Sequence, residues 1–155
     1  MISLDIVVGM NLHHPAWDVE IDIEGATLRA VRLAKHAGSV RLAANLYELE
    51  PGAVVSPLHF HHRNEELLFV LSGTPAVRRS NREVRDLTPG EVVAFRAGPT
   101  GQHQIVNRSN EPARVLICAT DELPEIAEQP ETGILAVLTD AGLRLIASAP
   151  YVDAD

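Results

Sequence analysis

The sequence predicts an all-β protein built as a sandwich-like barrel. Short apolar or alternating runs recur along the chain, and clusters of Pro, Gly, Asn and Ser separate them, as is typical of strands joined by turns. A short motif that ends one such run also ends another, which suggests two similar β-halves. At 155 residues, 46% of them hydrophobic, the chain is long enough for one domain with a core and too short for two ordinary ones. We therefore expect a single domain over residues 1–155.

The apolar runs define the expected elements in chain order. Residues 1–26 are poorly periodic and are expected to form an N-terminal arm. The strand candidates that follow are 27–35, 40–49, 65–72, 75–79, 82–87, 91–96, 102–107, 112–119, 133–139 and 143–148. The segment 121–132 is acidic and carries two prolines, so we expect a surface loop or a short helix there, within a C-terminal extension over 120–155. Thr139–Gly142 lies between two apolar runs and predicts the turn of a C-terminal β-hairpin.

The recurring motif has the pattern acidic-Leu-x-Pro-Gly. It occurs as Glu48–Gly52 and again as Asp86–Gly90, and a Val-Val pair follows each copy closely. In both places it closes one strand and begins a turn before the next. Two similar halves of this kind suit a closed barrel, which leaves few exposed strand edges.

Charge and cysteine content exclude several classes of partner and compartment. The formal net charge of −8 argues against nucleic acid binding, which needs a basic face, and against attraction to an anionic membrane surface. Cys118 is the single cysteine, so no disulfide can form within the chain and a reducing compartment is the simplest expectation. The N-terminus lacks the basic region of a signal peptide and no apolar run is long enough to span a bilayer. We therefore expect a cytoplasmic protein without nucleic acid or membrane partners.

Histidines and a carboxylate are spaced as a metal site requires. His59 and His61 are two apart, and on a strand residues i and i+2 point to the same face, roughly 6.5–7 Å apart, so their imidazoles can converge on one cation. Glu66 begins the next apolar run, where an inward carboxylate is costly unless it is paired or coordinated. His103 lies in a separate run next to glycine. An HxH pair alone arises by chance in many chains, so these residues by themselves leave metal binding and a structural role both open.

The two histidine segments resemble the two motifs of the cupin superfamily, in particular of its small single-domain barrel proteins. The first family motif, G-x5-HxH-x3,4-E-x6-G, matches Gly52, His59, His61, Glu66 and Gly73, with six residues before the first histidine instead of five. The second, G-x5-PxG-x2-H-x3-N, matches Gly90, Gly98, His103 and Asn107. Arg96 replaces the proline of this motif, and four residues instead of two precede His103.

The resemblance implies a fold and a ligand set. The fold is a double-stranded β-helix of the jelly-roll type, with its barrel core at about residues 40–119. The implied metal ligands are His59, His61, Glu66 and His103. Such a nitrogen and oxygen set without thiolate suits one divalent transition metal ion, Fe, Mn, Ni, Co or Zn. A +2 ion with one carboxylate leaves a net +1 at the site, which attracts anionic ligands.

Two classes of function follow from such a site. One is a metal-dependent enzyme, an oxygenase or an isomerase or lyase, acting on a small polar or anionic metabolite. The other is a non-catalytic module that binds or senses a small molecule, which the absence of an obvious general base beside the ligands favours. Fold resemblance does not choose between them, and the catalytic residues stay unassigned.

Other side chains could line a pocket. Tyr47 and Asn45 share one strand face and either line the site or belong to the wall. Arg78, Arg79 and Arg96 either anchor an anionic substrate or are surface charges. Asn107 is expected to bond a turn backbone, and the charges of Glu65 and His62 are expected to be solvated.

Strand-like runs outside the barrel core predict a homodimer. The runs 27–35, 133–139 and 143–148 are apolar on at least one face, and exposing them costs about 25 cal/mol for each Å² of apolar surface. A second copy of the chain would cover these faces and hide an edge strand, and two-fold pairing is the commonest closed assembly.

Overall fold

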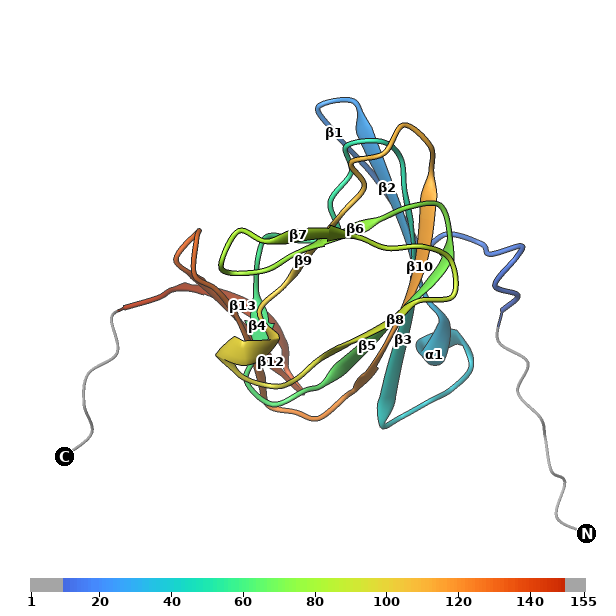
Figure 1. The fold of residues 1–155 in the computed structure, drawn as a ribbon. Helices are drawn as coiled ribbons and strands as arrows, with labels where there is room; N and C mark the ends of the chain where they lie inside the picture. The colour runs from blue at the N-terminus through green and yellow to red at the C-terminus, as the bar shows by residue number, and fades with distance from the viewer. Residues whose placement is uncertain (1–9, 150–155) are drawn as a thin grey trace, which may run out of the picture.

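The computed structural model describes residues 10–149, and it is built almost entirely of antiparallel strands. A six-stranded sheet forms one wall, in the order β1-β2-β3-β10-β5-β8. Its strands are β1 (Val19–Ile23), β2 (Ala26–Arg32), β3 (Leu42–Leu49), β10 (Ala113–Thr120), β5 (Glu66–Ser72) and β8 (Val92–Phe95). Figure 1 looks along the barrel, with this sheet on one side of the ring.

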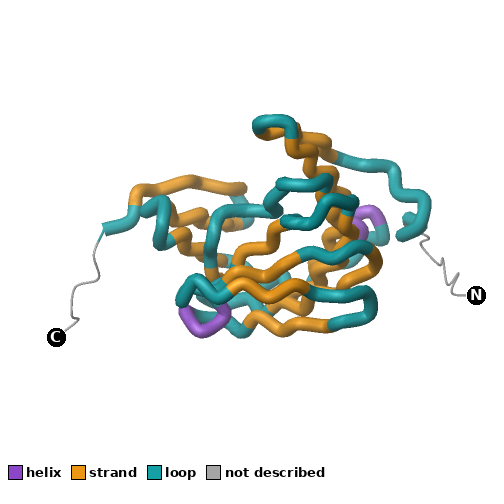
Figure 2. Tube along the Cα trace, turned by 45° about the horizontal axis from the view of Figure 1, so that its top comes forward, coloured by secondary structure: helices purple, strands orange, loops and turns teal. Residues whose placement is uncertain are grey.

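The opposite wall consists of two shorter sheets. The four-stranded sheet contains β13 (Gly142–Ala147), β12 (Ile134–Thr139), β11 (Glu125–Gln129) and β4 (Phe60–His61). The three-stranded sheet contains β7 (Val84–Asp86), β6 (Ala76–Arg78) and β9 (Gln104–Val106). A bridge between His59 and His103 links the two sheets just before β4 and β9. The expected jelly-roll barrel with a C-terminal hairpin is confirmed, and the β1–β2 and β12–β13 hairpins project from it in different directions (Figure 2).

The core lies between the two walls. Along β10, Ala113, Val115 and Ile117 are buried while the residues between them are only partly buried, as the alternation of a half-buried strand requires. Val115 packs with Leu68 of β5 and with other apolar residues of both walls. The remaining members of this cluster are Leu49, Ala53, Val70, Val77, Leu87, Phe95, Ile105 and Ile117.

The N-terminal segment packs on the outer face of the large sheet. Leu46 of β3 and Val31 of β2 are fully buried there, because Trp17 and Met10 cover them. The expected arm over 1–26 therefore includes packed residues and also a strand, since Val19–Ile23 forms β1 and pairs with β2 throughout. The first nine residues of that arm lie outside the described part of the chain.

The segment between β10 and β12 was predicted wrongly. The segment 121–132 was expected to be a loop or short helix, but its central residues form β11, which pairs with β12 on one side and with β4 on the other. The two prolines of the segment, Pro124 and Pro130, flank the strand and do not interrupt it. Proline is tolerated at strand boundaries because no ladder hydrogen bond is lost there.

The Pro-Gly motifs form matching turns. Ala53 N donates to Glu50 O at 2.9 Å, and Glu91 N donates to Thr88 O at 3.1 Å. Gly52 and Gly90 have φ of +88° and +90°. Proline followed by a glycine of positive φ is the pattern of a type II turn, so both copies of the motif turn the chain in the same way.

Helices contribute little to residues 10–149. α1 (Leu33–His36) interrupts the strand expected over 27–35, and η1 (Pro99–Gly101) is one turn of 3-10 helix before β9. Neither of these two helices in the described segment has the length and apolar character that a bilayer span would require.

Candidate metal centre

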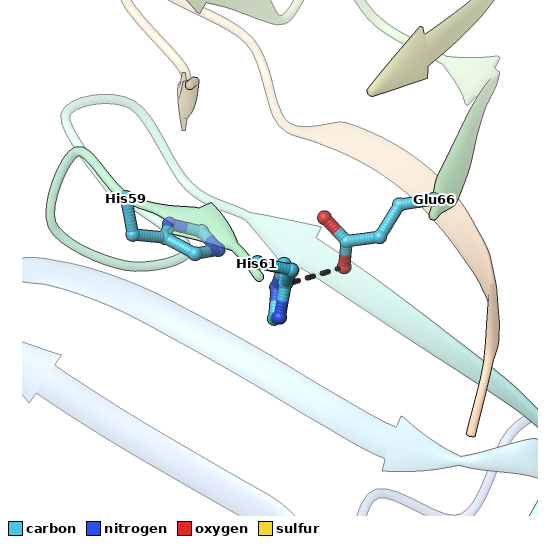
Figure 3. Close-up of side chains that lie close together, drawn as sticks. All are labelled: His59, His61 and Glu66. Carbon is cyan, nitrogen blue, oxygen red and sulfur yellow. Dashed lines mark ion pairs between the residues drawn. The ribbon is translucent and has the colours of Figure 1, made fainter. Parts of the chain in front are cut away.

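Three of the four predicted ligands meet inside the barrel. His59 and His61 come from the segment that forms β4, and Glu66 is the first residue of β5. One ligand atom from each lies within 4.8 Å of the others. Figure 3 shows His61 between His59 and Glu66, and its Nε2 lies 3.6 Å from Glu66 Oε1.

His103 joins this group from the other side. Its Nε2 lies 3.2 Å from Glu66 Oε2, and its ring centroid is 4.7 Å from that of His59. The imidazole is 1% exposed and stacks on Phe95 with ring centroids 3.6 Å apart. The structure thus brings all four predicted side chains together.

The short helix η1 accommodates the two residues by which the segment before His103 exceeds the family motif. Gly101 ends this turn so close to Arg96 that a Cβ at Gly101 would lie 1.7 Å from the Arg96 carbonyl oxygen. This close approach returns the chain to the barrel wall before His103. The departures from the family motif therefore change the loop and leave the histidine buried.

Backbone carbonyls orient two of the three imidazoles. His59 Nδ1 lies 2.9 Å from Pro57 O, and His103 Nδ1 lies 2.8 Å from Gly101 O. A carbonyl oxygen can only accept, so in each ring Nδ1 carries the proton. The Nε2 lone pairs of both rings are then free to bind a cation, which is the arrangement usual in metal sites.

Two buried polar atoms at the centre have no hydrogen-bond partner. They are His61 Nδ1 and Glu66 Oε2. An unsatisfied buried polar atom costs about 1–3 kcal/mol, and more when the group is charged. A cation among the four side chains would coordinate the carboxylate oxygen, so the residues present fit a metal ion.

The local electrostatics keep His59 and Glu66 in the protonation states that bind a metal ion. Burial, with the neighbouring His103, lowers the pKa of His59 to about 4, so this imidazole is neutral at physiological pH. Burial alone would raise the pKa of Glu66, but the imidazole of His103, whose Nε2 lies 3.2 Å from Glu66 Oε2, and the nearby His61 and His59 hold it below its usual value. Neutral imidazoles and an ionised carboxylate are the forms that bind a divalent ion.

A second buried carboxylate next to His61 was not predicted. Glu125 in β11 is 3% exposed, and its Oε1 lies 3.7 Å from His61 Nδ1. The buried Asn64 holds the same loop, since its Oδ1 accepts from Thr120 Oγ1 at 2.9 Å. The sequence carried little signal for Glu125, because Glu125–Gln129 does not alternate apolar and polar residues and the flanking prolines favoured a loop.

Tyr47 lies close enough to Glu66 for the carboxylate to affect its ionisation. Burial and the charge of Glu66 raise the pKa of Tyr47 to about 12, although the hydrogen bond with Asn45 opposes the shift. A hollow of about 370 Å³, lined in part by Tyr47, Asn45 and Arg32, adjoins this side of the barrel. Tyr47 is therefore a protonated phenol that lines this hollow.

The arginines that were considered as substrate anchors have other roles or positions. Arg78 makes two bonds with the Glu131 carboxylate, at 2.8 and 2.7 Å. Arg79 donates to Thr100 O at 2.6 Å, and Arg96 is exposed. Asn107 has the expected structural role, because its Nδ2 donates to Leu49 O at 2.9 Å and to Glu111 O at 2.7 Å.

Comparison with known proteins gives consistent results. A family model described as "Cupin domain" matches residues 45–119. The chain is 31% identical over 110 residues to the tetracenomycin polyketide synthase protein TcmJ of Streptomyces glaucescens, covering 71% of this chain and 68% of that protein.

Solved structures agree with this result. A sugar phosphate isomerase of the cupin superfamily from Silicibacter pomeroyi superposes with a TM-score of 0.78 at 25% identity, over 89% of this chain and 91% of that one. The polyketide cyclase RemF of Streptomyces resistomycificus, at 24% identity, shares the fold with a TM-score of 0.53, over 66% of this chain and 70% of that one. The motifs, the barrel and these similarities together show that the chain belongs to the cupin superfamily.

Proposed function

We propose that the protein binds one divalent transition metal ion through His59, His61, Glu66 and His103, and is a metal-dependent enzyme acting on a small polar or anionic metabolite. The observation that carries this proposal is the buried Glu66 Oε2, which has no hydrogen-bond partner although three imidazoles surround its carboxylate. The ion is Fe, Mn, Ni, Co or Zn, because the donor set is nitrogen and oxygen without sulfur.

The charges of the site favour an anionic ligand. A +2 ion with Glu66 leaves one net positive charge inside the barrel. Glu125 adds a negative charge, but hydrogen bonds from backbone N–H groups, including those of His62 at 3.0 Å and Asn64 at 2.8 Å, stabilise it. These backbone donors partly offset the charge of Glu125, and a divalent ion would attract the oxygens of carboxylates, phosphates and enolates through its open coordination positions.

The chemistry divides between the ion and Tyr47. When bound, a divalent ion would supply Lewis acidity toward a carbonyl or enediol oxygen. Tyr47, whose pKa burial and the charge of Glu66 raise to about 12, keeps its proton at neutral pH, so its phenol is proposed as a hydrogen-bond donor to a bound ligand. His59 and His103 keep their Nδ1 protons on backbone carbonyls and act as fixed ligands.

Isomerase or lyase chemistry is the form that we favour over oxygenase chemistry. The solved structure with a TM-score of 0.78 and 25% identity is described as a sugar phosphate isomerase, and sugar isomerisation needs a polarised oxygen and a base that moves a proton between two carbons. A divalent ion would polarise the substrate oxygen without a redox step, and the base that removes the carbon-bound proton is left unassigned.

Metal loading followed by a substrate panel tests the proposal. The purified protein is analysed for metal, then loaded in turn with Fe(II), Mn(II), Ni(II), Co(II) and Zn(II), and assayed with phosphorylated sugars and small hydroxy and keto acids. Glu66→Gln should lose metal and activity, whereas Glu65→Gln at the neighbouring exposed position should keep both. A wild-type protein that takes up none of the five ions would overturn the proposal, and ligand-dependent melting shifts without turnover would indicate a binding or sensing module.

Three further properties of the protein are proposed with this function. They are a cytoplasmic location, the absence of a nucleic acid partner, and assembly as a homodimer. The first two rest on the net charge of −8 and the single Cys118. The third rests on the exposed apolar side chains of β1 and β13.

A further inference from the structure

We infer that Glu125 is a positioning residue for His61, holding the proton on Nδ1 so that Nε2 is presented to the metal site. The inference rests on the proposed function, because it assigns His61 its role as a ligand. It concerns a carboxylate that lies outside the family motifs and 64 positions after His61 in the chain.

His61 lies between two carboxylates. Its Nε2 is 3.6 Å from Glu66 Oε1, and its Nδ1 is 3.7 Å from Glu125 Oε1. Both carboxylates are sheltered, with side-chain exposures of 13% for Glu66 and 3% for Glu125. A small rotation of the imidazole brings Nδ1–H within hydrogen-bonding distance of Glu125, and the opposite nitrogen then faces the site.

The contrast with the other two imidazoles identifies what His61 lacks. His59 and His103 each have a backbone carbonyl at Nδ1, at 2.9 and 2.8 Å. His61 Nδ1 is buried without a hydrogen-bond partner, and Glu125 supplies the nearby acceptor. A metal-ligating histidine almost always donates its second N–H to a carboxylate, a carbonyl or water. Glu125 therefore offers His61 Nδ1 the kind of acceptor that backbone carbonyls offer the other two histidines.

Backbone N–H groups hold the Glu125 carboxylate in position. Its carboxylate accepts N–H groups of the loop after His61, from His62 at 3.0 Å, Arg63 at 3.4 Å and Asn64 at 2.8 Å, and from Ile126 at 2.9 Å. This loop connects His61 to Glu66. One carboxylate thus holds the loop and faces the imidazole, and the register of β11 against β4 places it there.

The structural role and the positioning role predict different results. If Glu125 only anchored the loop, any loss of loop anchoring would weaken the site equally. Thr120→Val provides the matched control, because Thr120 Oγ1 donates to Asn64 Oδ1 at 2.9 Å and accepts from Glu65 N at 3.2 Å in the same loop. Glu125→Gln preserves side-chain size but removes the anionic acceptor.

Nitrogen NMR of the histidine side chains and Zn(II) affinity test the inference. In the metal-free wild type we expect His61 to carry its proton on Nδ1, and in Glu125→Gln to lose this preference. Zn(II) affinity, measured by chelator competition, should fall about 10–100-fold in Glu125→Gln and stay close to wild type in Thr120→Val.

Three results would overturn the inference. They are a wild-type His61 protonated on Nε2, an unchanged Zn(II) affinity in Glu125→Gln, or equal losses in Glu125→Gln and Thr120→Val. The tautomer of His61 in the wild type tests the inference even if Glu125→Gln does not fold. Failure of the wild type to bind Zn(II) or any other candidate ion would instead count against the proposed function, and the tautomer of metal-free His61 would still test the role of Glu125.

Discussion

His59 and His103 face each other across a reciprocal backbone bridge. His59 N donates to His103 O at 3.0 Å, and His103 N donates to His59 O at 2.9 Å. The two imidazoles are therefore held 4.7 Å apart by strand pairing and not by their own contacts. Because the backbone sets this spacing, we expect the candidate centre to keep its geometry when a side chain of the group is replaced.

Replacing His59 and His61 together with alanine should abolish metal uptake. The wild type should gain stability from bound metal, about 2.7 kcal/mol when the free ion is at a hundred times its dissociation constant, and the double variant should gain none. Elemental analysis and thermal unfolding with and without the ion measure both effects. His62→Ala is the control, because His62 is exposed and its Nε2 contacts Glu128 at 3.0 Å, away from the centre. Equal metal content in the double variant and the wild type would contradict the prediction.

The metal-free protein should lose stability as the pH falls from about 6.5 to 4. Burial and His103 lower the pKa of His59 from its usual 6.5 to about 4, so in this range the unfolded chain binds a proton that the folded chain does not. This loss of stability is absent well above pH 6.5 and grows as the pH falls toward 4. Chemical unfolding in the presence of a chelator, at several pH values, should show a weaker dependence for His59→Gln. An identical pH dependence in this variant would exclude His59 as a cause.

Asn107→Ala should destabilise the fold by about 1–3 kcal/mol. The side chain is fully buried, and its Nδ2 donates to the carbonyls of Leu49 and Glu111, which would be left without this donor. Urea unfolding measures the change in free energy. Asn110→Ala, three residues later at an exposed position, should lie within about 0.5 kcal/mol of wild type. A similar small effect at Asn107 would show that water replaces its bonds.

The protein should form a homodimer through its projecting hairpins. Leu143 and Leu145 share one face of β13 and are 61% and 65% exposed, and Ile21 and Ile23 share one face of β1 and are 45% and 63% exposed. Both strands are also sheet edges, where unpaired backbone groups favour pairing with another chain.

Light scattering at micromolar concentration should give twice the 16.8 kDa mass of the chain. The variant with Leu143→Lys and Leu145→Lys should shift toward the monomer, because burying these charges in an interface is costly. Val40→Lys is the control, since Val40 is 86% exposed in a loop. A wild-type species of 16.8 kDa would contradict the prediction.

The sequence by itself determined the local features of the protein. Short apolar or alternating runs bounded by turn residues predict β3, β5 and β10. The i, i+2 spacing of His59 and His61 indicates two imidazoles on one face, and the Pro-Gly pairs indicate turns. Each of these signals lies within a few residues, so a single segment suffices to read it.

Only the tertiary structure decided which segments meet. The bridge that brings His103 to His59 and the register that brings Glu125 of β11 to His61 of β4 join residues far apart in the chain. Strand pairing of this kind depends on the packing of the whole barrel, so no local pattern in 121–132 shows that its buried glutamate faces a histidine. Tyr47 likewise comes under the influence of Glu66 only because β3, β10 and β5 lie side by side. The candidate ligands were thus evident from the sequence through its resemblance to the family, whereas the buried carboxylate beside His61 came from long-range register.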